Sequence, residues 1–355
     1  MKKLKLGFVG TGGMGQMAHL SNYAQLTDEC EIVAIAEPRS EQAKLVAGRY
    51  GIREVYADHR ELLANAKVDA VVAAQPYRRH SVILPDLLTA GIPVFTEKPL
   101  SLTTAAGERL VRLGEQNGVL HMVGYHKRSD PAVEYAKGVV EQWKASGEYG
   151  RMKYVRVSMP PGDWIGGADK PLESGEPRPN DELEPFGVEF SEAANREYDA
   201  FVNYYIHQVN MIRHMLGEPY RLAFADPSRV LLSGESESGV CAVLEMGAYQ
   251  TSIEWHEAVL VAFERGFVKV ELPPPLARQQ AGKVTIMKDS GQGTPEYTIP
   301  VMPNLSAMRN QARNFLAAVR GERPAPCTAR EALEDLKLAE AYIRAVHPQT
   351  VPNQS

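Results

Sequence analysis

The sequence is poor in cysteine, lacks long apolar runs and carries no large excess of charge. Its cysteines are Cys30, Cys241 and Cys327, which stand far apart and form no CxxC pair. An odd number of isolated cysteines favours neither a disulfide framework nor a zinc site, and this usage is typical of a reducing cytoplasm. We therefore expect a cytoplasmic protein with no bound metal.

No apolar run approaches the roughly 18 residues of a membrane span, so we expect no membrane partner. The basic start, Met1–Lys5, is similar to that of a signal peptide, but the apolar stretch behind it is short and breaks into glycines, which favours a first strand. The net charge of -5 argues against nucleic acid as the main partner. With 355 residues, the chain exceeds the about 250–300 residues at which one core stops growing, and predicts two domains.

The most informative segment is Gly10-Thr11-Gly12-Gly13-Met14-Gly15, which lies between an apolar run, Leu6–Val9, and a helical pattern from Gln16. A strand, a glycine turn and a helix in this order are typical of a dinucleotide site. Gly10 permits the tight turn, Gly12 lets the backbone approach a pyrophosphate, and Gly15 allows close packing of helix against strand. The helix N-terminus then offers its N–H groups to the phosphates.

An acidic residue follows at the spacing that such a site requires. A second apolar strand, Glu31–Ala36, ends in Glu37, and acids about 20 positions beyond the glycines bind ribose hydroxyls. Glu37 favours NAD because its carboxylate would repel a 2′-phosphate. Arg39 could accommodate that phosphate, so NADP stays open as the alternative.

The first 125 residues alternate between apolar runs and helical patterns. The runs at Val68–Ala74, Val94–Thr96 and Leu120–Gly124 are short and do not alternate, as in strands buried on both faces. Helical patterns separate them: Glu41–Tyr50, Ser81–Ala90, and Leu102–Asn117 with Ser101 as its cap. This alternation predicts an N-terminal Rossmann domain with a doubly wound parallel sheet over residues 1–125.

After about Ser129 the pattern changes to successive strands, which predicts a second α/β domain over 126–355 with an open, mostly antiparallel sheet. The expected elements are a helix at Pro131–Ser146, strands at Lys153–Met159, Val230–Leu232, Val240–Met246, Thr251–Trp255, Val259–Phe263, Val268–Leu272 and Val284–Met287, and a helix at Leu305–Arg320. Thr328 and Glu331 form a capping box for a final helix to about Val346, which is able to pack back on the first domain.

Pro160–Phe190 has no periodicity and holds six prolines and five glycines. A loop this long inside a compact domain is usually functional or disordered. Trp164 could stack on a ring of the substrate. A surface excursion or a subunit contact is the alternative interpretation.

Glu97-Lys98-Pro99 comes directly after a predicted parallel strand. Ligands bind beyond the carboxyl ends of such strands, so we expect Glu97 and Lys98 to line the dinucleotide crevice. An ammonium there can donate a hydrogen bond to a substrate hydroxyl and stabilise alkoxide character. A solvated lysine at a strand end is the alternative.

A predicted helix, Asp199–Leu216, carries amides and imidazoles on one face. Asn203, His207, Asn210 and His214 fall within about 60° of one another at helical spacing. His207 is the candidate general base or acid because its ordinary pKa lies near the operating pH, and Asn203 could bind the imidazole or a substrate hydroxyl. The alternative is a buried structural histidine.

Two further strand ends should rim the nicotinamide or the substrate. Gln75-Pro76 ends the fourth strand, with His80 at the start of the next helix, and Tyr125-His126 ends the sixth. A helix-start role is the alternative for His80. The other histidines show no constellation and are interpreted as structural: His19, His59, His121, His256 and His347.

With these residues in view, the chain resembles the Gfo/Idh/MocA family of NAD(P)-dependent sugar and cyclitol oxidoreductases over nearly its whole length. The motifs that carry the resemblance are the glycine turn, Ala90–Leu100 with Glu97-Lys98-Pro99, His207 with Leu216–Pro219, and Arg309–Phe315. The resemblance implies that Lys98 and His207 are catalytic. Relatives commonly carry Asp four residues before the histidine. This chain has Asn203, so His207 should be less basic, and Asn203 could hold a substrate hydroxyl instead.

The leading hypothesis is hydride transfer between nicotinamide and a secondary hydroxyl of a sugar, sugar derivative or cyclitol, with NAD as the expected cofactor and NADP as the alternative. A second hypothesis is cleavage of a glycoside by transient oxidation and elimination, with NAD as a recycled cofactor. The third is a regulatory dinucleotide-binding protein without activity. An exposed sheet face in the second domain favours a homo-oligomer, either a dimer or a tetramer.

Overall fold

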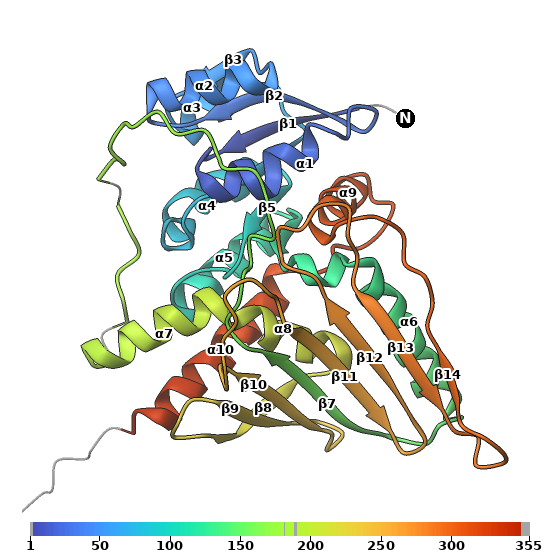
Figure 1. The fold of residues 1–355 in the computed structure, drawn as a ribbon. Coiled ribbons are helices and arrows are strands. Elements are labelled where there is room, and N and C mark those ends of the chain that lie inside the picture. The colour runs from blue at the N-terminus through green and yellow to red at the C-terminus, as the bar shows by residue number, and fades with distance from the viewer. Residues whose placement is uncertain (1–2, 181, 188–189, 349–355) are drawn as a thin grey trace, which may run out of the picture. The chain divides into compact units, whose positions relative to one another are not determined.

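The computed structural model describes residues 3–180, 182–187 and 190–348. The chain forms two compact units (Figure 1). The first comprises residues 1–129, 167–186 and 306–334, and the second comprises 130–166, 187–305 and 335–355. The assignment of cofactor and substrate to separate domains stays a prediction.

The first unit contains a six-stranded parallel sheet with the strand order β3-β2-β1-β4-β5-β6. The strands are β1 (Leu4–Val9), β2 (Cys30–Ala36), β3 (Glu54–Tyr56), β4 (Ala70–Ala73), β5 (Val94–Glu97) and β6 (His121–Gly124). Every residue of β4, β5 and β6 is buried, which explains their unalternating apolar sequences. This order is that of a doubly wound Rossmann sheet, so the predicted fold class is confirmed for this unit.

Helices connect these strands in the expected places. They are the π-helical η1 (Gly15–Leu20), α1 (Ser21–Tyr23), α2 (Ser40–Tyr50), α3 (His59–Asn65), the 3-10 turn η2 (Tyr77–Arg79), α4 (His80–Thr89), α5 (Thr104–Gln116) and the 3-10 turn η3 (His126–Ser129). The predicted cap of α5 is wrong. Thr103 accepts the N–H of Ala106, while the Ser101 hydroxyl donates to the carbonyl of Thr103.

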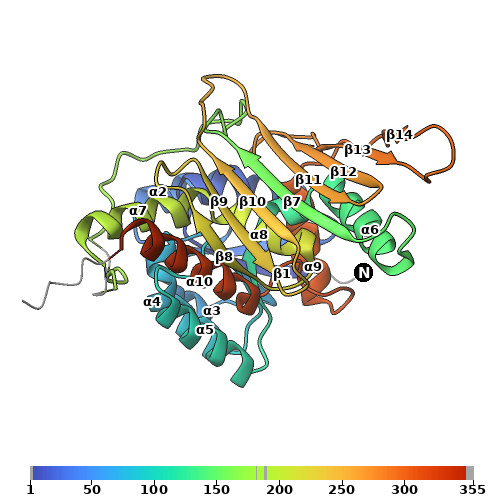
Figure 2. The same cartoon turned by 90° about the horizontal axis from the view of Figure 1, so that it is seen from below.

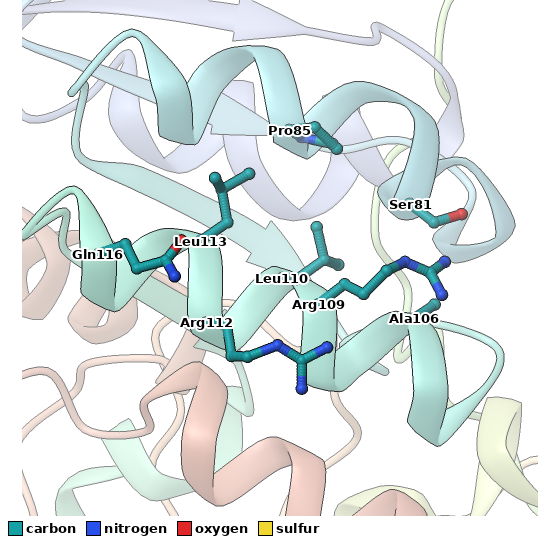
Figure 3. Close-up of a pocket in the computed structure, with 8 residues that line it drawn as sticks. All are labelled: Ser81, Pro85, Ala106, Arg109, Leu110, Arg112, Leu113 and Gln116. Carbon is teal, nitrogen blue, oxygen red and sulfur yellow. The ribbon is translucent and has the colours of Figure 1, made fainter.

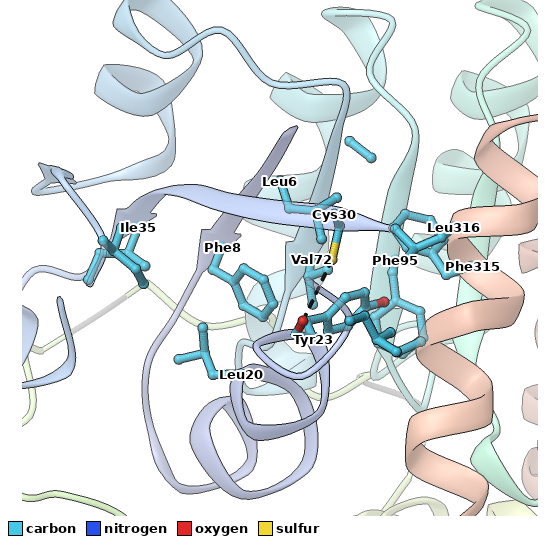
Figure 4. Close-up of a cluster of buried hydrophobic side chains, with 14 of the residues drawn as sticks. Leu6, Phe8, Leu20, Tyr23, Cys30, Ile35, Val72, Phe95, Phe315 and Leu316 are labelled. Atoms are coloured by element: carbon cyan, nitrogen blue, oxygen red, sulfur yellow. Dashed lines mark hydrogen bonds between the residues drawn. The ribbon is translucent and has the colours of Figure 1, made fainter. Parts of the chain in front are cut away.

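A helix from late in the sequence, α9 (Ala307–Val319), completes the core of the first unit. Phe95 of β5 and Phe315 of α9 meet edge to face with their ring centroids 5.7 Å apart (Figure 4). The same cluster includes Tyr23, Leu316 and Cys30, and burial raises the pKa of the Cys30 thiol to about 12. The first unit therefore depends on residues beyond its N-terminal segment.

The second unit is built on an eight-stranded sheet with the order β14-β13-β12-β11-β7-β10-β9-β8 (Figure 2). The strands are β7 (Met152–Met159), β8 (Tyr220–Ala225), β9 (Leu231–Ser236), β10 (Cys241–Met246), β11 (Glu257–Phe263), β12 (Gly266–Leu272), β13 (Lys283–Lys288) and β14 (Glu296–Thr298). All neighbours are antiparallel except β7 and β10. The predicted open, mostly antiparallel sheet is confirmed.

One face of this sheet packs on helices, because α6 (Pro131–Ser146) lies on β12 and α8 (Ile206–Leu216) lies on β7. Along β11, buried and half-buried residues alternate strictly, as in a sheet with one covered face. The last helix, α10 (Ala329–Val346), begins with the predicted capping box. The N–H of Thr328 donates to the Glu331 carboxylate at 3.0 Å, and the N–H of Glu331 donates to the Thr328 hydroxyl at 3.3 Å.

Two expected elements of the second unit differ from prediction. Residues 251–255 form no strand, because the Thr251 hydroxyl donates to the carbonyl of Glu254 at 2.6 Å and closes a local turn. The predicted helix at Asp199–Leu216 is two helices, α7 (Glu192–Tyr204) and α8, which separate at Tyr205. Aromatic and β-branched residues meet at this break and lower the local helix propensity.

Candidate functional site

The glycine turn after β1 has the backbone that its sequence requires. Gly10 has φ +93, and a Cβ on it would lie 2.9 Å from the carbonyl oxygen of Ala74. A Cβ on Gly15 would lie 2.7 Å from the carbonyl oxygen of Gly10. Gly12 faces open space, which fits close approach by a ligand. Binding of the pyrophosphate by Gly12, Gly13 and Met14 stays a prediction.

Glu37 lies at the end of β2 and turns its carboxylate toward this glycine turn. Its Oε2 accepts the Thr11 N–H at 3.1 Å and the Thr11 hydroxyl at 2.8 Å. Its Oε1 accepts Nε of Arg39 at 2.7 Å. Burial raises the pKa of Glu37, but the hydrogen bonds from Arg39 and Thr11 outweigh it and hold that pKa below its usual value. Thr11 and Arg39 thus fix the acid that is predicted to bind ribose.

Part of the proline- and glycine-rich segment belongs to this unit and lies on the glycine turn and α2. We call its described residues 167–180 and 182–186 the strap. The buried amide of Gln16 donates to the carbonyl of Leu172 and accepts the N–H of the same residue. The buried amide of Gln42 pairs with the carbonyl of Leu172 and the N–H of Ser174. The strap is therefore an ordered part of the first unit.

A second anchor fixes the strap at the other side of the sheet. The Glu184 carboxylate, 5% exposed, accepts the N–H groups of Leu102 and Thr103 at 3.2 and 2.8 Å, just before α5. The Glu184 carbonyl accepts Nε of Arg78 at 3.1 Å, and the Arg78 guanidinium lies over the ring of Phe186. No sequence motif signals either anchor.

Glu97 and Lys98 end β5 as predicted, and a buried imidazole joins them. Nε2 of His19, on η1, lies 2.6 Å from Oε1 of Glu97, while the Lys98 N–H donates to Oε2 at 3.2 Å. The expectation that His19 stands apart from the other candidate site residues is therefore wrong. Burial lowers the pKa of Lys98 to about 8, with Glu97 opposing this shift and Lys127 adding to it. The ammonium of Lys98 is thus charged at neutral pH and close to losing its proton.

Two imidazoles near these strand ends, those of His126 and His80, are neutral. Burial lowers the pKa of His126 to about 3, with the Lys127 charge adding to the shift. Burial also lowers the pKa of His80 to about 4, and its Nδ1 lies 3.1 Å from the carbonyl oxygen of Leu100. Tyr125 is buried, whereas Gln75 is half-buried and Pro76 is exposed. Their contacts with nicotinamide or substrate stay predictions.

In the second unit, His207 is half-buried near the start of α8, and Asn203 is exposed near the end of α7. Tyr205 interrupts the helix between them but keeps right-handed helical dihedrals, φ -88 and ψ -5, so their predicted shared role stays a prediction. Asn210 is buried, and its amide donates to Asp335 at 2.6 Å. Trp164 is 38% exposed, and its carbonyl accepts the N–H of Leu276 at 3.2 Å.

The other features of the described residues do not add a second site. No group of three metal-binding side chains occurs among them, and none of their helices is long and apolar enough to cross a membrane. A cavity lies between α4 and α5 and is lined by Ser81, Pro85, Ala106, Arg109, Leu110, Arg112, Leu113 and Gln116 (Figure 3). None of these residues is a predicted site residue.

Comparison with known proteins agrees with this geometry. Residues 4–125 match the GFO_IDH_MocA model, described as an oxidoreductase family with an NAD-binding Rossmann fold. The myo-inositol 2-dehydrogenase of Thermotoga maritima is 25% identical over 63% of this chain and 58% of its own length. An inositol 2-dehydrogenase of Corynebacterium glutamicum is 32% identical over 44% of this chain and 45% of its own length. The chain thus aligns with about half the length of these relatives.

Two solved structures share the fold over nearly the whole chain. The UDP-N-acetylglucosamine 3-dehydrogenase of Acidithiobacillus ferrooxidans has a TM-score of 0.69 at 18% identity and covers 98% of both chains. An oxidoreductase from Agrobacterium radiobacter, solved with NAD+, L-tartaric acid and magnesium, has a TM-score of 0.71 at 16% identity. The match covers 98% of this chain and 97% of that one.

Proposed function

We propose that this chain, whose residues 4–125 match the model of the Gfo/Idh/MocA oxidoreductases, is an NAD(P)-dependent enzyme of that family and transfers hydride between nicotinamide and a secondary hydroxyl of a sugar, sugar derivative or cyclitol. The observation that carries the proposal is Lys98, which stands at the carboxyl end of β5 in the dinucleotide-binding unit. Its side chain is half-buried, and desolvation lowers its pKa to about 8 although the Glu97 charge opposes this shift, as in a tuned cation rather than a fully solvated lysine. The inositol dehydrogenases among the relatives support the substrate class.

The residues that would hold the dinucleotide fit it. The open space at Gly12 accepts a pyrophosphate, and the N–H groups at the start of η1 would bind its charge. Glu37 would bind the adenosine ribose, while Gln75, Pro76 and His80 would border the nicotinamide. When bound, the nicotinamide ring supplies the hydride acceptor or donor.

Two side chains would then act on the substrate hydroxyl. Lys98 would donate a hydrogen bond to the oxygen and stabilise its developing negative charge. His207 would remove or return the hydroxyl proton. Asn203, Tyr125, His126 and Trp164 are the side chains that we propose to contact the rest of the substrate.

Activity measurements test this function directly. Purified protein is assayed with NAD and NADP against a panel of inositols and monosaccharides, and the same panel is run with Lys98→Met and His207→Ala. We expect a loss of kcat of roughly 100-fold or more in each variant, since positioned acid–base and electrostatic groups contribute about that much. The matched control is His256→Ala, an exposed histidine of the same unit. Unchanged turnover in both site variants would refute the assignment.

We also propose that the protein is a homo-oligomer. The half-buried face of the eight-stranded sheet, seen in the alternation of β11, offers a surface to a second copy. Light scattering coupled to size-exclusion chromatography measures this, and a monomer mass at micromolar concentration would contradict it.

A further inference from the structure

A strap carboxylate lies at the N-terminus of α2. The N–H of Gln42 donates to Oε2 of Glu176 at 2.8 Å, and the Ser174 hydroxyl donates to the same oxygen at 3.0 Å. The residue that precedes α2, Arg39, provides no side-chain cap of its own. A carboxylate 134 positions away in sequence therefore takes the place of the local cap.

The strap cannot leave this position without cost. Gln16 and Gln42 are 3% and 1% exposed. Their amide oxygens accept N–H groups of the strap backbone. Their amide nitrogens donate to the carbonyls of Leu172 and Thr11. Withdrawal of the strap would remove the N–H donors of both amide oxygens. Glu176 is thus a fixed charge.

This charge stands beside the residues that would read the adenosine ribose. Glu37 directly follows β2, Arg39 lies two positions further on, and α2 starts at the next residue. The hydrogen bond to Glu37 raises the pKa of Arg39, and the charges of Glu176 and Glu173 raise it further. Arg39 is therefore paired with Glu37 and also under the influence of the negative charges of Glu176 and Glu173.

We propose that Glu176 is a cofactor-selectivity residue that makes this enzyme use NAD and reject NADP, an inference that rests on the proposed function. An arginine after β2 and the N-terminus of the next helix are the groups that would attract a 2′-phosphate. Here the Glu176 carboxylate already binds the helix N–H group and places a like charge where that phosphate would bind. Glu37, which is hydrogen-bonded to Thr11 and Arg39, adds a second negative charge.

The same strap leaves the rest of the dinucleotide site to the cofactor. Its hydrogen bonds near the glycine turn use the amides of Gln16 and Gln42, which in turn hold the carbonyl of Thr11. A pyrophosphate would use N–H groups of the turn instead. NAD binding and strap docking are therefore compatible.

Calorimetric titration with NAD+ and with NADP+ separately, in the absence of substrate, tests the inference. The variants are Glu176→Ala, which removes the carboxylate, and Glu176→Gln, which keeps its shape without the charge. The matched control is Glu182→Gln, an exposed acid of the same strap. Thermal unfolding checks that each variant is folded. If Glu176→Ala is unfolded, the NADP+ affinity of Glu176→Gln tests the inference.

We expect the wild type to bind NAD+ more tightly than NADP+. NADP+ affinity should rise by about tenfold or more in Glu176→Ala and by less in Glu176→Gln, because charge-assisted pairing with a phosphate is strong. NAD+ affinity should stay within about threefold, and Glu182→Gln should match the wild type. If the wild type binds NAD+ but the NADP+ affinity is unchanged in both Glu176→Ala and Glu176→Gln, this inference is refuted and the proposed function is not. Absence of any NAD+ binding to the wild type would refute the proposed function as well.

Discussion

At the scale of single residues, burial sets the charge of the groups around the strand ends of the first unit. His126 and His80 have pKa values of about 3 and 4, so both are neutral at pH 7. Lys98, with a pKa of about 8, keeps its proton there. The cation that is proposed to bind the substrate oxygen is thus close to its titration point.

The pKa of Lys98 predicts a pH limit on activity. As the pH rises through about 8, Lys98 loses its proton and with it the proposed hydrogen bond and charge, so kcat/KM should fall. Lys127→Met removes a charge that lowers the Lys98 pKa, and should move this alkaline limb to higher pH. Lys137→Met, on α6, is the control with an unchanged profile. An alkaline limb that stays in place in Lys127→Met would contradict the assignment of the limb to Lys98.

The buried pair of His19 and Glu97 predicts a stability effect. His19→Ala leaves the Glu97 carboxylate buried without its imidazole partner, and should destabilise the fold by about 1–3 kcal/mol. The comparison is His59→Ala, because the partner of His59 is an Asp86 side chain that is 37% exposed. This variant should lower the free energy of unfolding by less, about 0–1 kcal/mol. Urea unfolding at pH 7 measures both, and equal losses would contradict the distinction.

Sequence spacing was sufficient to predict Glu37 and Lys98, because each follows a strand whose end is fixed by an apolar run. It could not predict their partners. Thr11 meets Glu37 because the neighbouring strands β1 and β2 end at one edge of the sheet, whereas His19 reaches Glu97 from η1. Periodicity also predicts one continuous helix through Asn203 and His207, but it does not predict the interruption at Tyr205.

At the scale of elements, periodicity predicts the buried strands and misses the edges. The three strands that the sequence analysis does not contain, β3, β8 and β14, are all edge strands. β3 and β14 are three residues long with no fully buried residue, and β8 has one. An edge strand that buries so little has no apolar pattern to reveal it.

The strap is the element whose role the sequence left most open, and its second anchor can be tested. Glu184→Ala removes the acceptor of the N–H groups of Leu102 and Thr103, and should destabilise the fold by about 1–2 kcal/mol. It should also speed proteolytic cleavage within the strap, because local opening becomes easier. Limited proteolysis with mapping of the cut site measures this, with Glu182→Gln as the control. Equal cleavage rates would contradict the anchor.

At the scale of the whole molecule, each unit is assembled from segments far apart in sequence. The first unit takes α9 into its core, where Phe315 is fully buried against Phe95. The sequence predicts α9 as a helix, but its amphipathic pattern does not state which sheet it covers. Periodicity likewise does not predict that α10 is divided between the two units at residues 334 and 335.

The shared core predicts that a late residue stabilises the N-terminal fold. Phe315→Ala should lower the free energy of unfolding by about 3–5 kcal/mol, because it removes a buried ring and leaves a cavity. Val301→Ala, at a side chain that is 96% exposed, should change it by less than about 0.5 kcal/mol. Denaturant unfolding measures both. A small effect of Phe315→Ala would contradict the place of α9 in this core.

The most direct test of the account is transfer of a labelled hydride. A cyclitol or sugar deuterated at its carbinol carbon is mixed with the protein and NAD+, and the reduced nicotinamide is analysed by mass spectrometry. The account predicts that deuterium appears on the nicotinamide with the wild type and is lost with Lys98→Met. Unlabelled nicotinamide, or equal transfer by Lys98→Met, would contradict it.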